Sequence, residues 1–133
     1  MPKTMYTRAL MIISAAFLAI LGLATSFAAE EILSVHGATP DTSTILLIRM
    51  MGALYLGFAL LNWTARGVLI GGIYNRPVAF GNFVHFTMVG IMLTKAAIVH
   101  GATQLAASAF VFSIFAVWFG LVLFRHSPQS TTN

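Results

Sequence analysis

Four apolar stretches, each long enough to cross a lipid bilayer, constrain this chain more than any other feature. They cover about residues 8–29, 43–65, 77–99 and 103–124 of the 133-residue sequence. A hydrocarbon core about 30 Å thick requires roughly 20 helical residues to span it. A spanning segment must also satisfy its own backbone hydrogen bonds, and four short strands could not close into a barrel. The sequence therefore predicts one all-α transmembrane domain, residues 1–133.

The composition excludes several classes of protein. Hydrophobic residues make up 59% of the chain and charged residues 8%, whereas about 25% of an average soluble domain is charged. This leaves too little polar surface to cover a soluble fold. The sequence contains no cysteine, which excludes disulfides and thiolate metal sites. It also lacks a glycine-rich phosphate loop, a nucleophile elbow and paired acids within a span, so little in the sequence supports an enzyme, and we expect no metal site.

The basic residues indicate how the spans are oriented. They lie at the N-terminus, in the middle connection and at the C-terminus, as Lys3, Arg8, Arg66, Arg76 and Arg125. The other two connections contain no Lys or Arg, and cationic flanks remain cytoplasmic. We therefore expect an up-down-up-down four-helix bundle with both termini in the cytoplasm. The net charge of +4 follows from this rule, so nucleic acid is not an expected partner.

Two features of the spans leave alternatives open. The first span follows Lys3 and Arg8 and ends in Ser26-Phe-Ala-Ala29, which also resembles a signal-peptide cleavage site; we interpret it as a membrane helix. The second span could be shifted to residues 52–73, which would bury Arg66 and release Arg49 to water. We prefer residues 43–65, with the glycine-rich segment 67–74 at the interface.

A short segment occurs twice, as Val-His-Gly-Ala-Thr at 35–39 and again at 99–103. A glycine after a helix supplies a left-handed C-terminal cap, and a threonine two residues later can cap the next helix. Pro40 then occupies a first-turn position where proline is tolerated. The repeat is either a pair of good tight turns or the trace of a duplicated helical hairpin. In either case, the first helix is expected to continue past Ala29 if His36 ends it as His100 ends the third.

Small residues recur at helical spacing in three spans, which predicts where helices approach one another in lipid. The stripes are Ala15, Ala19, Gly22 and Ser26; Ala53 and Gly57; and Ala106, Ala109, Ser113, Ala116 and Gly120. We expect the eleven phenylalanines to fill the helix contacts or to face lipid.

Ionisable residues within a membrane helix are candidates for function. Arg49 lies six residues into the second span, about 9 Å along its axis, and Lys95 lies at a similar depth in the third. Their predicted partners are Glu30 and Glu31 at the end of the first span. We predict an ion pair of Arg49 with one of these acids. The four residues together form a hypothetical binding site for a polar or anionic ligand; alternatively, the cations extend to the lipid headgroups.

A second polar group lies towards the opposite side, and comprises Asn62, Arg66, Asn75, Arg76, Asn82 and His85. Asn82 and His85 are three residues apart and therefore share one helix face. His85 could serve proton transfer or ligation, but the other histidines lie near the helix ends, so a haem held by two histidines of one copy is not expected. The alternative for this group is interhelical hydrogen bonding.

The segment Ile48–Gly57, in which an arginine and spaced glycines open a helix, resembles a pattern in small four-helix bacterial inner-membrane proteins classed as domains of unknown function. The segment Asn62–Arg66 resembles a helix end at the cytoplasmic interface in the same group. The resemblance implies a multi-pass protein of the bacterial inner membrane and no particular activity.

Three classes of function remain. A scaffold or accessory subunit of a membrane assembly is our first expectation, with lipids, further copies or other membrane proteins as partners. The alternative is a protein that binds or transports a small molecule or lipid through its outer polar group. A redox or enzymatic subunit that uses His85 is the third class. No cofactor is identified by the sequence.

Overall fold

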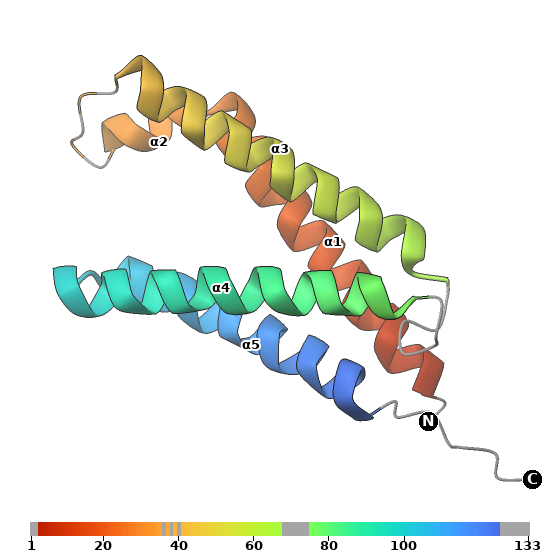
Figure 1. The fold of residues 1–133 in the computed structure, drawn as a ribbon. Helices are drawn as coiled ribbons and strands as arrows, with labels where there is room; N and C mark the ends of the chain where they lie inside the picture. Colours follow the sequence, from red (N-terminus) through yellow and green to blue (C-terminus); the bar gives the residue numbers. More distant parts are fainter. Residues whose placement is uncertain (1–2, 36, 38, 40, 68–74, 126–133) are drawn as a thin grey trace, which may run out of the picture. The chain divides into compact units, whose positions relative to one another are not determined.

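The computed structural model describes residues 3–35, 37, 39, 41–67 and 75–125. Within these residues the chain forms helices and no strand: α1 (Lys3–Phe27), α2 (Ala29–Val35), α3 (Thr42–Ala65), α4 (Arg76–His100) and α5 (Thr103–Arg125) (Figure 1). All except α2 are long and apolar enough to cross a membrane. The predicted all-helical architecture with four long apolar helices is therefore confirmed.

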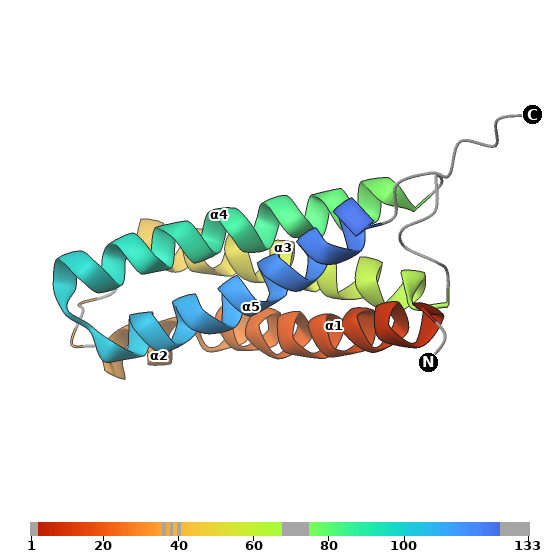
Figure 2. The same ribbon diagram turned by 90° about the horizontal axis from the view of Figure 1, so that it is seen from below.

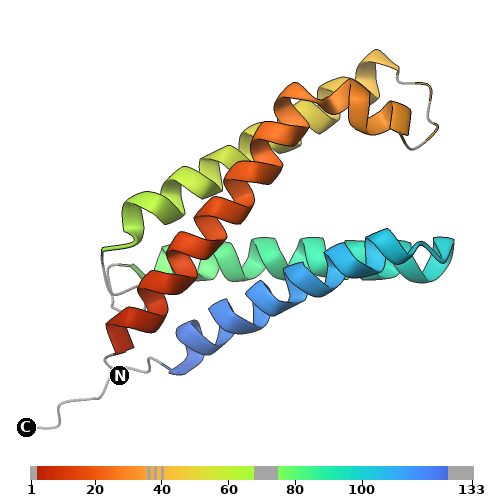
Figure 3. The ribbon, with the colours of Figure 1, turned by 180° about the vertical axis from the view of Figure 1, so that it is seen from behind.

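The four predicted spans agree with α1, α3, α4 and α5 to within a few residues, and helical structure continues past Ala29 as expected. Helical structure begins at Lys3 and, after an interruption at Ala28, continues through α2 to Val35. The amide of Ala28 donates to Ala24 O at 2.8 Å, and the amide of Ile32 donates to Ala28 O at 3.0 Å. Helical hydrogen bonds therefore persist across a bend (Figure 3).

The two repeated turns share the predicted left-handed glycine. The φ angle is 71° at Gly37 and 62° at Gly101, which is the C-cap of α4. The predicted threonine caps are wrong. Asp41, not Thr39, caps α3, and Thr103 is already the first residue of α5. His36, Ala38 and Pro40 lie outside the described residues.

The N-cap of α3 is a carboxylate, a stronger hydrogen-bond acceptor for backbone amides than a hydroxyl. Asp41 accepts hydrogen bonds from the Thr44 amide and from Thr44 Oγ1, both at 2.8 Å. These bonds to the charged form, first of all the one from the backbone, hold the pKa of Asp41 below its ordinary value. The cap therefore stabilises the fold above the ordinary pKa of an aspartate, and this contribution is lost as the pH falls through the lowered value.

The chain divides into two compact units, Met11–Arg66 and Met1–Leu10 together with Gly67–Asn133. In the first unit α1 and α3 form an antiparallel pair, which we call the first hairpin. Ser14 of α1 contacts Asn62 of α3, whereas Gly22, further along α1, lies against Leu56, nearer the start of α3. The order of contacts is reversed between the two helices, as an antiparallel pair requires.

The other unit contains α4 and α5, which pack along most of their lengths and form the second hairpin. Phe83 of α4 lies against Gly120 of α5, and Gly90 lies opposite Ser113, so these helices are also antiparallel. Figure 2 shows α5 running obliquely along α4 from the tight turn at Gly101.

Candidate functional site

The predicted outer group is built around an ion pair between Arg49 and Glu30. Arg49 Nη2 lies 3.1 Å from Glu30 Oε1, and the two side chains are 49% and 58% exposed. This is one of the two pairings that the sequence predicts. Glu30 lies in the first turn of α2, where the positive end of the helix dipole also favours a carboxylate. The bend at Ala28 thus places Glu30 against α3.

The other two members of this group have different surroundings. Glu31 is exposed on α2, and its backbone oxygen accepts a hydrogen bond from Ser34 Oγ at 2.8 Å. Lys95 belongs to α4, in the other compact unit. Arg49 is therefore paired with Glu30 within the first unit, and Lys95 must be described with the second hairpin.

A hydrogen bond between α1 and α3 involves a residue of the inner polar group. Asn62 Nδ2 donates to Ser14 Oγ at 3.0 Å, and both residues are fully buried. Ser14 Oγ in turn donates to Met11 O at 3.2 Å within its own helix. Arg66 packs over the Trp63 ring, 4.0 Å from the ring centroid, and also donates to Trp63 O. These residues support the first hairpin rather than leaving a polar surface open to a ligand.

Asn82 and His85 lie on α4, which belongs to one compact unit, whereas Asn62 and Arg66 belong to the other. Asn82 is buried and donates from Nδ2 to Val78 O at 2.9 Å. The His85 ring lies 5.4 Å from the ring of Phe86, edge to face, and 6.4 Å from that of Phe112. His85 is thus part of an aromatic contact between α4 and α5.

Phe86 is the centre of this aromatic contact. It is fully buried and stacks on Phe115 at 4.8 Å and on Phe119 at 5.6 Å between ring centroids. Phe112 adds a tilted contact at 5.5 Å. Offset stacking of aromatic rings is favourable beyond the area that it buries. Phenylalanine therefore fills the helix contact of the second hairpin, one of the two roles expected from the sequence.

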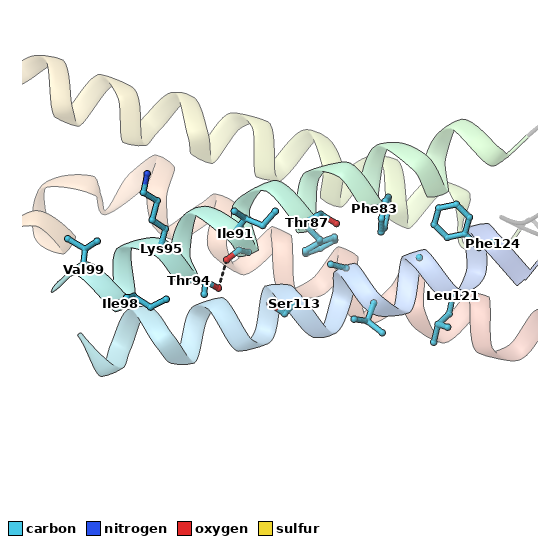
Figure 4. A pocket seen from close by; sticks show the side chains of 15 residues that line it. Phe83, Thr87, Ile91, Thr94, Lys95, Ile98, Val99, Ser113, Leu121 and Phe124 are labelled. Carbon is cyan, nitrogen blue, oxygen red and sulfur yellow. Dashed lines mark hydrogen bonds between the residues drawn. The ribbon is translucent and has the colours of Figure 1, made fainter. Parts of the chain in front are cut away.

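A groove of about 810 Å³ runs between α4 and α5 beside this contact. Its lining is almost entirely apolar and comes from both helices: Phe83, Phe86, Thr87, Gly90, Ile91, Thr94, Lys95, Ile98, Val99, Ser113, Ala116, Val117, Gly120, Leu121 and Phe124 (Figure 4). We call this feature the α4–α5 groove. Small-molecule sites are typically concave, mostly apolar and about 300–1,000 Å³ in volume.

The two ends of the α4–α5 groove differ in character. At one end Lys95 rises from α4 on the side away from α5, with Ile98 and Val99 beside it; at the other end are Phe83 and Phe124 (Figure 4). These two rings meet edge to face with centroids 5.7 Å apart. The groove is thus bordered by a cation at one end and by aromatic rings at the other.

The hydroxyl groups along the groove bond mainly within their own helices. Thr94 Oγ1 donates to Gly90 O at 2.7 Å, and Ser113 Oγ donates to Ala109 O at 2.8 Å. Thr87 Oγ1 is buried and has no hydrogen-bond partner among the described residues. Because the Thr94 and Ser113 protons are used internally, this part of the groove offers an apolar surface.

The described residues contain no group of three or more His, Asp or Glu side chains placed to hold a metal ion. Comparison with known protein families, with curated proteins and with solved structures found no match to this chain. The functional proposal below therefore rests on the local geometry of the described residues.

The sequence interpretation missed the α4–α5 groove, although it contained one signal. Ala106, Ala109, Ser113, Ala116 and Gly120 form the predicted small-residue stripe of α5, and three of these five, Ser113, Ala116 and Gly120, line the groove. The stripe by itself predicts only a packing surface. A pattern of small residues does not indicate whether the partner helix fills the space beside it or leaves it open.

Proposed function

We propose that this chain is a multi-pass protein of the bacterial inner membrane that binds a lipid or another long apolar molecule in the α4–α5 groove. The α4–α5 groove, with its volume of about 810 Å³ and its apolar lining, is the observation that carries the proposal. This corresponds to the second function class of the sequence analysis, a protein that binds a small molecule or lipid. The proposed site lies in the second hairpin instead of the outer polar group, and Lys95 is the one member of that group that belongs to it.

The proposed topology is an up-down-up-down four-helix bundle with both termini in the cytoplasm. Two antiparallel hairpins of membrane-spanning length support it, together with the basic residues of the termini and middle connection. Cysteines introduced at Ser34 and Ser130 are expected to react with a membrane-impermeant reagent from opposite sides of intact cells. Labelling of both from outside would contradict the topology.

Photo-crosslinking tests the groove directly. The full-length protein is placed in phosphatidylcholine vesicles that contain a phospholipid with a diazirine in its acyl chain, and the labelled peptides are mapped. We expect labels on groove-lining residues of α4 and α5. Thr94→Phe places a ring in the groove and should remove most of this labelling.

Ser108→Phe is the matched control for this experiment. Ser108 is exposed on α5 outside the groove, and its hydroxyl donates to Gln104 O at 3.1 Å, a bond of the same kind as that of Thr94. Labelling should survive this change. If Thr94→Phe and Ser108→Phe retain equal labelling of the groove residues, the groove is not the binding site.

A scaffold or accessory subunit is the second candidate, favoured by one face of α3. Ala53 is exposed, and a Cβ atom added at Gly57 would meet no atom within 4 Å in the described structure. Small residues with this spacing allow close helix approach in membranes. If this face joins copies of the chain, Gly57→Leu should reduce the oligomer mass measured by light scattering in mild detergent. An unchanged mass would remove this support.

A further inference from the structure

We propose that Lys95 gives the α4–α5 groove a preference for a phospholipid with a net negative headgroup, whose acyl chain lies in the groove. This inference rests on the proposed function and adds the chemical class of the ligand. It commits to one occupant, a lipid of the surrounding bilayer in the leaflet at the His100 end of α4. Three features of the groove support it: depth, charge and the state of its hydroxyl groups.

The position of Lys95 along α4 matches the level of a lipid headgroup. The helix has 25 residues, about 37 Å at 1.5 Å per residue, against a hydrocarbon core of about 30 Å. Lys95 lies five residues before His100, so its α-carbon is about 7.5 Å from that end. A lysine side chain at this depth brings its ammonium group to the interface while its methylenes remain in hydrocarbon.

The groove below Lys95 is longer than the hydrocarbon depth of one leaflet. Along α4, the twelve residues from Lys95 to Phe83 span about 18 Å, and half of a hydrocarbon core is about 15 Å. Phe83 and Phe124 lie at the far end of the groove, where their rings meet edge to face. With α4 centred in the bilayer, the Lys95 α-carbon lies about 11 Å from the midplane on the His100 side, and Phe83 lies about 7 Å beyond the midplane. The space therefore accommodates an acyl chain that starts beside Lys95 and reaches through its leaflet to the midplane.

The charge at this site is uncompensated within the groove. Lys95 is exposed, and the described lining residues include no acid and no second cation. An ammonium group binds phosphate oxygens as a compact point charge. A zwitterionic headgroup brings its own cation, which competes with Lys95 for the phosphate, whereas a net anionic headgroup does not. The single positive charge therefore favours the anionic lipid.

Two hydroxyl groups of the groove reinforce this polarity. Thr94 and Ser113 donate their protons to the backbone carbonyls of their own helices, so they have no proton left to donate to a ligand. The groove is thus cationic at its rim and apolar below it, the complement of an anionic lipid. The competing explanation is that Lys95 extends to any nearby headgroup without retaining one, and the experiment below separates the two.

The test compares two diazirine-bearing probes with identical acyl chains, phosphatidylglycerol and phosphatidylcholine. Each is present at the same low fraction in phosphatidylcholine vesicles that contain the full-length protein. Near a membrane surface, one lysine contributes about a fivefold preference for anionic lipid. We therefore expect about fivefold stronger labelling of α4 and α5 peptides by the phosphatidylglycerol probe. Lys95→Gln should make the two probes equal, whereas Lys95→Arg should preserve the preference.

Arg8→Gln is the matched control for charge removal, because Arg8 is exposed on α1 and is not a lining residue of the groove. It should leave the preference intact. Equal labelling by both probes in the wild-type protein, or a preference that survives Lys95→Gln, overturns the inference. If that equal labelling is still removed by Thr94→Phe, the proposed function stands. If neither probe labels the groove, the proposed function fails as well.

Discussion

The two hairpins hold their helices together in opposite ways. In the first, small residues bring the backbones close: a Cβ atom at Gly52 would lie 2.7 Å from the backbone nitrogen of Ser26, and one at Gly22 would lie 2.9 Å from that of Leu56. In the second, the stacked ring of Phe86 occupies the contact. The first hairpin also has a buried hydrogen bond between α1 and α3.

The different contacts leave different amounts of space. A hollow beside α1 and α3 measures about 370 Å³, against about 810 Å³ for the α4–α5 groove. Close backbone contact leaves little room between α1 and α3 at Gly22 and Gly52. Large rings fill one position along a pair of obliquely crossing helices, and the space between the helices on either side of the rings stays open. The close backbone contacts favour the stability of the first hairpin, and the larger hollow beside the second is where we propose that a ligand binds.

The largest expected effect comes from adding a single methyl group at Gly52. In Gly52→Ala the new Cβ meets the Ser26 backbone, which cannot move as a flexible side chain can. We expect a loss of about 3 kcal/mol, the upper part of the range for overpacking, measured by thermal unfolding in detergent. Gly57→Ala, in the same helix but facing open space, should be neutral or slightly stabilising. Equal effects of the two changes would refute the close contact of the first hairpin.

The corresponding change in the second hairpin removes the central ring. Phe86→Ala vacates about 100 Å³, and at about 24 cal/mol per Å³ the cavity term amounts to about 2 kcal/mol. Phe110→Ala, which removes a ring that is 67% exposed on α5, should cost much less under the same conditions. Matching losses for both variants would mean that the stacked cluster does not hold α4 and α5 together.

The buried hydrogen bond of the first hairpin should contribute less than either packing contact. Hydrogen bonds between transmembrane helices contribute about 0.6 kcal/mol on average, and up to about 1.7 kcal/mol. A double-mutant cycle with Ser14→Ala and Asn62→Leu, followed by unfolding in detergent, measures the coupling. We expect a value in this range, and purely additive effects would show that the bond contributes nothing to stability.

The ion pair should have the smallest effect. Because Arg49 and Glu30 are about half exposed, the pair falls in the class that contributes about 0–1 kcal/mol and weakens with salt. Arg49→Ala is expected to lower stability by no more than this amount. Glu31→Ala is the control, since its carboxylate makes no ion pair among the described residues. A loss of several kcal/mol in Arg49→Ala would instead indicate a pair sealed from water.

Sequence reasoning reached the helices because their determinants are local. Apolar length predicts each span, and Gly37 and Gly101 adopt the expected left-handed conformation. One error was also local: the turn pattern predicts Thr39 as the cap of α3, whereas Asp41, two residues later, is the cap. The repeated turn predicts that helical structure continues past Ala29, but it does not predict the interruption at Ala28.

The sequence predicted candidate partners for a side chain but not which candidate it contacts. Charge and depth predicted that Arg49 would pair with Glu30 or Glu31, but the choice of Glu30 depends on the bend at Ala28. The sequence assigned Asn62 to a polar group without identifying Ser14 as its partner. Two residues far apart in the chain meet only when the packing of their helices fixes both rotation and register, and a single sequence contains neither.

By itself, the sequence determined the four apolar helices and the glycine turns, because length, hydropathy and backbone freedom act within a few residues. Only the tertiary structure decided that α1 and α3 meet backbone to backbone, that Phe86 forms the contact of α4 with α5, and that a groove remains beside it. The physical reason is that a cavity is a property of the distance between two helices. That distance depends on which side chains meet across the contact, and the composition of either helix alone does not determine it.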